Sequence, residues 1–127
     1  MGMRNFARSA APFLAPIALM ALIFAFSAMP SDSEDHGLLV LLLRKLTHFS
    51  EYFVLMGLWW WALARRMDAQ RAIGMALAIT VAYAVSDEIH QTFVDGRVGT
   101  WRDVLIDSTG ALTAAWLITR SRRRTVA

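Results

Sequence analysis

Residues 10–29 read AAPFLAPIALMALIFAFSAM, a run without a single charged side chain. A helix that crosses the hydrocarbon core of a bilayer needs about 20 predominantly apolar residues, and this run is long enough. It is also longer than the apolar region of an ordinary signal peptide, so we expect a retained span rather than a cleaved leader. The stretch predicts a membrane helix over about residues 10–30.

Three further apolar stretches follow along the chain, and they predict helices over about residues 46–64, 70–88 and 103–120. Each reaches the length of a span only when its polar end is included, which draws attention to those ends. We expect residues 30–45 to form a loop, and Thr100 is a typical N-cap for the last helix. The pattern predicts an all-α fold, an integral membrane four-helix bundle.

The composition agrees with a membrane protein. Of the 127 residues, 57% are hydrophobic and 18% are charged, whereas an ordinary soluble domain has about half and about a quarter. This length allows one domain, so we expect a single transmembrane domain over residues 1–127. The sequence has no cysteine, which excludes disulfides, thiolate metal sites and cysteine nucleophiles. A disordered chain is excluded and a soluble enzyme is disfavoured.

The basic residues are unevenly distributed along the chain. Nine of the 13 Lys and Arg residues lie before the first span, in the 65–71 segment or in the tail from Arg120. Short loops rich in Lys and Arg stay in the cytoplasm, so we expect a multi-pass membrane protein with both termini cytoplasmic. The basic tail is typical of an anchor near anionic lipid. It has no interleaved aromatic residues, so we expect the lipid bilayer, and no nucleic acid, as a partner.

In that orientation the ionisable residues of the spans gather at the outer ends of the last three helices. One face of the second helix carries Lys45, His48, Glu51 and Tyr52. Glu51 lies one turn from His48 and can orient its imidazole. An ionisable group inside a membrane is costly unless it is paired, and it is a functional candidate by default.

The following loop and helices add polar groups at the same depth. The complete candidate ligand-binding set is Lys45, His48, Glu51, Tyr52, Asp87, Glu88, Gln91, Arg97, Asp103 and Asp107. Arg97 is a natural partner for these acids or for an anionic ligand. The alternative is a structural network in which Lys45 and the arginines neutralise the acids. We expect neither a metal ion nor another cofactor.

Three segments resemble motifs of the VanZ-like family of small bacterial membrane proteins. Residues 45–52, KLTHFSEY, match its K-x-x-H-F-x-E-Y signature, and residues 84–91, AVSDEIHQ, match its A-x-x-D-E-x-x-Q segment. Residues 96–110 contain its G-R, D-x-x-x-N and glycine positions in order. Asp107 stands where that pattern usually has Asn, which adds an acid and disfavours a purely neutral hydrogen-bonding role.

The resemblance implies an integral protein of the bacterial inner membrane that acts at the cell envelope, and the family's namesake is associated with low-level resistance to the glycopeptide teicoplanin. Our leading hypothesis is a protein that binds a phospholipid headgroup or a lipid-linked cell-wall precursor at the outer leaflet. Lys45 and Arg97 would contact its phosphate. Such binding could mask or reorganise the target of a lipophilic glycopeptide.

Two other classes of function stay open. A membrane hydrolase or transferase would act on a lipid-linked substrate with His48 as a general base oriented by Glu51, or with a hard divalent cation held by the carboxylates. A small proton-coupled exporter would use Glu51, although transporter sites tend to lie at the midplane of the bilayer. Turnover separates the enzyme from the binding protein.

Overall fold

The computed structural model describes residues 2–30 and 37–127, which form four α-helices and no strand. In chain order these are α1 (Gly2–Ser27), α2 (Gly37–Leu63), α3 (Ala69–Gln91) and α4 (Trp101–Val126). The predicted all-α fold with four helices is therefore confirmed.

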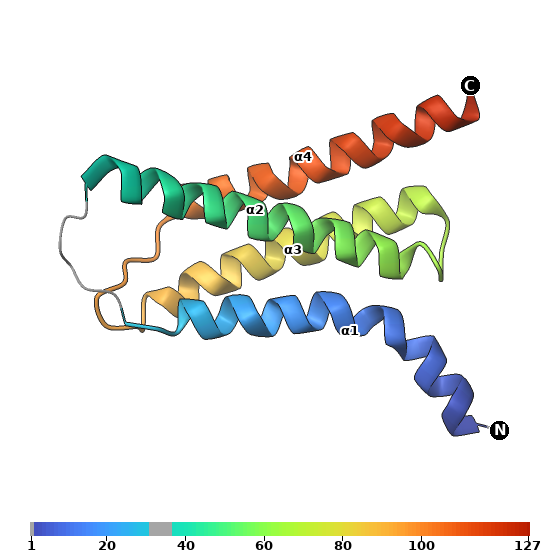
Figure 1. The fold of residues 1–127 in the computed structure, drawn as a ribbon, viewed down its shortest axis with the longest axis horizontal. Helices are drawn as coiled ribbons and strands as arrows, with labels where there is room; N and C mark the ends of the chain where they lie inside the picture. The colour runs from blue at the N-terminus through green and yellow to red at the C-terminus, as the bar shows by residue number, and fades with distance from the viewer. Residues whose placement is uncertain (1, 31–36) are drawn as a thin grey trace.

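The helices lie side by side along one long axis and alternate in direction (Figure 1). Both chain termini and the turn between α2 and α3 lie at one end, which we call the arginine end because it carries Arg65, Arg66, Arg71 and the arginines of residues 120–124. The last turns of α1 and α3 and the first turns of α2 and α4 lie at the other end, which we call the distal end (Figure 1). The basic segments thus share one end of the molecule, as the charge distribution predicts.

The start of α2 differs from the prediction. This helix begins at Gly37 instead of near residue 46, so residues 38–45 are helical and not a loop. The reason is local, because leucine is a strong helix former and nothing in the sequence LLVLLLRK breaks a helix. The large side chains of residues 38–43 are between 40% and 70% exposed, so α2 continues past Lys45 as an uncovered apolar segment.

The two outer helices are also longer than predicted. The first helix begins at Gly2 and ends at Ser27, and α4 continues to Val126, so the basic tail is helical. Pro12 and Pro16 lie inside α1, where each removes a backbone hydrogen bond, and the helix is bent in its first half (Figure 1). Within the described residues α1 packs against α2 and α3 but not against α4.

Close packing of α2 against α4 centres on small residues. Gly110, Ala111, Ala114 and Ala115 are all buried on α4. A Cβ atom on Gly110 would overlap the backbone carbonyl oxygen of Phe49, so only glycine allows the two helix backbones to approach this closely. This contact lies one turn from Asp107 and fixes how α2 and α4 face each other at the distal end.

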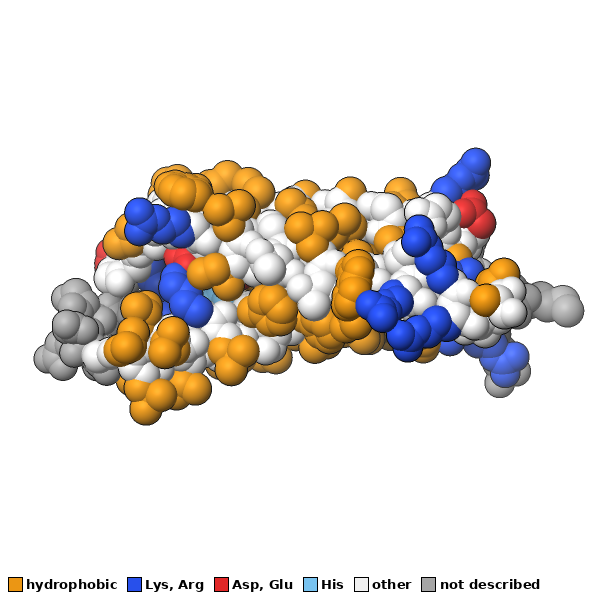
Figure 2. All heavy atoms as spheres, turned by 90° about the horizontal axis from the view of Figure 1, so that it is seen from above, with side chains coloured by type: hydrophobic (Ala, Val, Ile, Leu, Met, Phe, Trp, Pro, Cys, Tyr) orange, Lys and Arg blue, Asp and Glu red, His pale blue; other side chains and the backbone are white. Residues whose placement is uncertain are grey.

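The surface has an extensive apolar part. On the face shown in Figure 2, hydrophobic side chains spread over the middle of the molecule and Lys and Arg side chains gather toward both ends. Two helical segments, Phe6–Ser27 and Ala69–Gln91, are long and apolar enough to cross a membrane. Most of the first segment is uncovered by the rest of the protein. An apolar helix left uncovered in this way needs a lipid or protein environment.

Candidate functional site

A cavity of about 290 Å³ opens at the distal end between α1, α2 and α3. It is lined by Ile23, Phe26, Ser27, Arg44, Thr47, His48, Glu51, Asp87, Gln91 and Arg97. Figure 2 looks into a hollow at this end, where basic side chains lie beside acidic and histidine side chains. Five of the ten candidate residues therefore line one cavity: His48, Glu51, Asp87, Gln91 and Arg97.

The other five candidates lie outside the lining of this cavity. They are Lys45, Tyr52, Glu88, Asp103 and Asp107. Arg44 lines the cavity and was not among the candidates. It lies one turn before His48 on the same helix, so the sequence carried a signal for it. That signal was missed because residues 30–45 were expected to be a loop.

Asp87 lines the cavity and carries a buried carboxyl group. Its Oδ2 atom accepts hydrogen bonds from Tyr52 and from Gln91, both at 3.4 Å. The Oδ1 atom of Asp87 has no hydrogen-bond partner among the described residues. A buried carboxylate oxygen without a donor is costly, so this group is a candidate to accept a hydrogen bond from a ligand.

Arg97 does not pair with any of the acids in the described structure. Its Nε donates to the carbonyl oxygen of Met29 at 3.0 Å, and its Nη2 donates to that of Phe26 at 3.1 Å. These carbonyls lie at the C-terminal end of α1, where the helix dipole favours a cation. The expected pairing with the acids is therefore wrong, and Arg97 instead fastens its loop to α1. A guanidinium has five N–H groups, so Arg97 keeps donors for a ligand in the cavity.

Lys45 forms an ion pair with Asp103 and joins α2 to the first turn of α4. Thr100 donates to Oδ2 of Asp103 at 2.8 Å, and its Oγ1 accepts from the backbone N–H of Asp103 at 3.2 Å. Thr100 is therefore the N-cap of α4, as predicted. Lys45 and Asp103 form a structural clamp in this conformation, so the ammonium group is not directed at the cavity.

The imidazole of His48 contacts an acid on another helix. Its Nδ1 lies 3.2 Å from Oδ1 of Asp107, which is completely buried. The prediction that Glu51 orients His48 is wrong, because the close contact of α2 with α4 at Gly110 turns this face of α2 toward Asp107.

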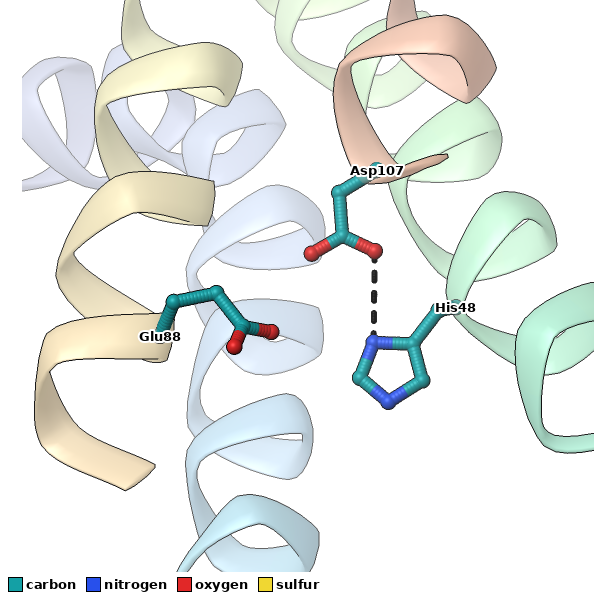
Figure 3. A group of neighbouring side chains, drawn as sticks. All are labelled: His48, Glu88 and Asp107. Carbon is teal, nitrogen blue, oxygen red and sulfur yellow. Dashed lines mark hydrogen bonds and ion pairs between the residues drawn. The ribbon is translucent and has the colours of Figure 1, made fainter. Parts of the chain in front are cut away.

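Glu88 on α3 lies beside His48 and Asp107. Its side chain is 4% exposed, and its Oε2 accepts from the backbone N–H of Thr100 at 2.9 Å. One nitrogen or oxygen atom from each of His48, Glu88 and Asp107 lies within 4.8 Å of the other two (Figure 3). The distal end therefore contains two adjoining features, the open cavity and this buried group, and His48 belongs to both.

The chain matches the VanZ/LLP1 family over residues 6–122, which is nearly its whole length. It belongs to the VanZ/LLP1 family. The predicted family resemblance is thus confirmed, and this VanZ/LLP1 member with its two apolar helices is a membrane protein. No curated protein and no solved structure matches the chain.

Proposed function

We propose that this VanZ/LLP1 protein spans the bacterial inner membrane four times with both termini in the cytoplasm. The arginine end then faces the cytoplasm, in agreement with the rule that Lys and Arg remain inside. The distal cavity opens toward the outer leaflet. In this orientation it binds the phosphate-bearing headgroup of a phospholipid or of a lipid-linked cell-wall precursor.

The observation that carries this proposal is the combination of side chains in the cavity. Exposed Arg44 and half-buried Arg97 line it together with Glu51 and the buried Asp87. Guanidinium groups bind phosphate oxygens through charge-assisted hydrogen bonds. Carboxylates deeper in the cavity accept from hydroxyl or ammonium donors of the same headgroup.

The position of the cavity favours a ligand with a hydrocarbon tail. Phe26 of the cavity lining is 50% exposed, and Leu22 and Phe24 before it on α1 are 51% and 52% exposed. They lie on the part of α1 that runs from the cavity toward the middle of the bundle, and so toward the bilayer core in the proposed orientation (Figure 1). A lipid can place its headgroup in the cavity while its tail lies along these apolar surfaces, whereas a free phosphate gains nothing from them.

Binding to the purified protein in detergent tests the proposal. The ligands are a short-chain phosphatidylglycerol, a short-chain prenyl diphosphate, the corresponding diacylglycerol and inorganic phosphate. We expect one of the two phosphate-bearing lipids to bind best, and the better one identifies the source of the headgroup. Arg44→Gln should weaken that binding about tenfold, because it removes one charge-assisted contact.

Arg102→Gln is the matched control, since Arg102 is exposed at the same end and does not line the cavity. Equal affinity for diacylglycerol and for the phosphate-bearing lipids would refute the proposal. An unchanged affinity of the Arg44→Gln protein would refute the assigned role of the cavity.

A second candidate function is suggested by His48 itself. Its Nδ1 contacts Asp107, and the ring lines the cavity. An imidazole oriented by a carboxylate is the arrangement of a general base. If the protein is a hydrolase of a phosphate-bearing lipid, His48→Gln abolishes turnover. If it only binds the lipid, no turnover is detected in the wild type and His48→Gln only weakens binding.

A further inference from the structure

His48, Glu88 and Asp107 meet although they come from three different helices. His48 and Asp107 are 59 positions apart in the sequence. The three residues therefore do not form a short metal-binding motif that could be recognised from the sequence. Each residue directs one nitrogen or oxygen atom into a common space, and these atoms lie within 4.8 Å of one another (Figure 3).

Two carboxylate oxygens of this group are buried without a partner. Asp107 is 0% exposed, and its Oδ2 has no hydrogen bond within the described part of the chain. Glu88 is 4% exposed, and the same holds for its Oε1. In Figure 3 the second oxygen of Asp107 and the carboxylate of Glu88 face the space between the residues. A buried carboxylate oxygen without a donor is costly, so a bound ligand would stabilise it.

The local charge points to a cation. Among the side chains that the structure describes, no Lys or Arg forms an ion pair with Glu88 or Asp107. Two basic residues at this end have other partners, because Lys45 pairs with Asp103 and Arg97 donates to backbone carbonyls of α1. A bound divalent ion would supply the compensating positive charge.

We propose that His48, Glu88 and Asp107 bind a divalent transition-metal ion such as Zn²⁺ or Mn²⁺. The imidazole nitrogen disfavours Ca²⁺ and Mg²⁺, which prefer oxygen ligands alone, and the three residues form the mixed set that first-row metals accept. Ligand bonds of about 2.0–2.2 Å place neighbouring donors roughly 3.4 Å apart around a tetrahedral ion. Nδ1 of His48 and Oδ1 of Asp107 already lie 3.2 Å apart. Rotation of the Glu88 side chain would bring one of its carboxylate oxygens to a similar distance from these two atoms.

This inference goes beyond the proposed function, because binding of the ion does not require the lipid headgroup. Three protein ligands leave a coordination position for water or for an oxygen of a ligand. His48 also lines the cavity, so the ion would lie next to whatever occupies it. The site runs against the expectation that no metal ion binds. It also differs from the alternative of a hard cation held by carboxylates alone, because one of its ligands is a histidine nitrogen.

The test is metal binding to the untagged, chelator-treated full chain in detergent. We expect equilibrium dialysis against Zn²⁺ and against Mn²⁺ to give one tightly bound ion per chain for at least one of them. The preferred ion should raise the melting temperature, because it binds the folded state. Co²⁺ should produce visible absorption bands when it occupies the site. The absence of a stoichiometric ion in the wild type would refute the proposal without any variant.

Variants then assign the ligands. Asp107→Asn and His48→Gln should each lower the affinity for the ion more than about 100-fold. Residues that only support the ligands have smaller effects. Asp95→Asn, which changes an exposed acid at the same end, should leave the affinity unchanged. Full affinity in both ligand variants would place the ion elsewhere and overturn the assignment. Arg44→Gln keeps the ion even if it abolishes lipid binding, so the two proposals fail separately.

Discussion

The two ends of the bundle use charged residues in opposite ways. At the arginine end the side chains of residues 120–124 are exposed, and Arg71 pairs with Asp68 at 3.3 Å with both side chains largely in solvent. At the distal end Asp87, Glu88 and Asp107 are buried. Exposed charges position a protein at little cost, whereas buried charges are costly and need partners.

Cavity size does not distinguish the two ends. A hollow of about 440 Å³ at the arginine end exceeds the distal cavity of about 290 Å³. It is lined by Gln70, Ile73, Thr119, Arg122, Arg123, Val126 and Ala127, and contains no acid. The buried carboxylates and the histidine therefore distinguish the distal end, which is why the proposed site lies there. Four experiments test this difference between the ends.

Survival under teicoplanin should show the largest difference. If the wild type protects a deletion host, we expect Glu51→Gln and Asp87→Asn to reduce survival to that of the host with an empty vector, because each replaces a carboxylate oxygen of the distal cavity with an NH2 donor. The double change Arg122→Gln with Arg123→Gln at the arginine end should protect like the wild type. Membrane expression is matched in every strain. Equal loss of protection in both groups would remove the functional distinction between the ends.

Stability should respond strongly to a methyl group at Gly110. Gly110→Ala should destabilise the fold by about 3 kcal/mol, because the new Cβ overlaps the carbonyl oxygen of Phe49. Gly74→Ala, which has open space around its Cβ position, should be neutral or stabilise by up to about 1 kcal/mol. Thermal unfolding in detergent measures both. A neutral Gly110→Ala would mean that α2 and α4 are not held at this distance.

The ion pairs at the two ends should contribute differently to the free energy of unfolding, by less than the two glycines do. Lys45→Met should cost about 2 kcal/mol, between the values for exposed and fully buried pairs, because the carboxyl of Asp103 is only 15% exposed. Arg71→Met should cost less than about 1 kcal/mol, since its pair with Asp68 is exposed. Both values come from the same unfolding experiment, and equal losses would contradict the difference in burial.

Membrane orientation should change least when charged residues are substituted. The chain has no cysteine, so single cysteines can be placed at Ala127 and at Asp95 and labelled from outside the cell with an impermeant maleimide. We expect labelling at position 95 and none at position 127. Replacing the tail arginines with Gln should leave this pattern unchanged, because Arg65, Arg66 and Arg71 still retain their loop inside. Labelling at position 127 in the unaltered tail would reverse the proposed topology.

The sequence predicted the number of helices and the end at which each basic segment lies, because hydropathy and charge are properties of neighbouring residues. The partner of His48 could not be predicted in the same way. Glu51 is its neighbour along the helix, but Asp107 is its neighbour in space, and the choice depends on how closely α4 approaches Phe49 at Gly110. The early start of α2 was missed because Arg44 and Lys45 resemble a helix boundary, although Lys45 has an acid to pair with on α4.

The uncovered start of α2 has a consequence for the membrane around the protein. Its 27 residues span about 40 Å, whereas the hydrocarbon core of a typical bilayer is about 30 Å thick. Such a mismatch is relieved by tilting the helix or by changing the local thickness of the bilayer. Because α2 packs against the other three helices, a tilt of α2 tilts the whole bundle. In the proposed orientation a thicker membrane covers the mouth of the distal cavity and a thinner one exposes it, so lipid composition would control access to the site.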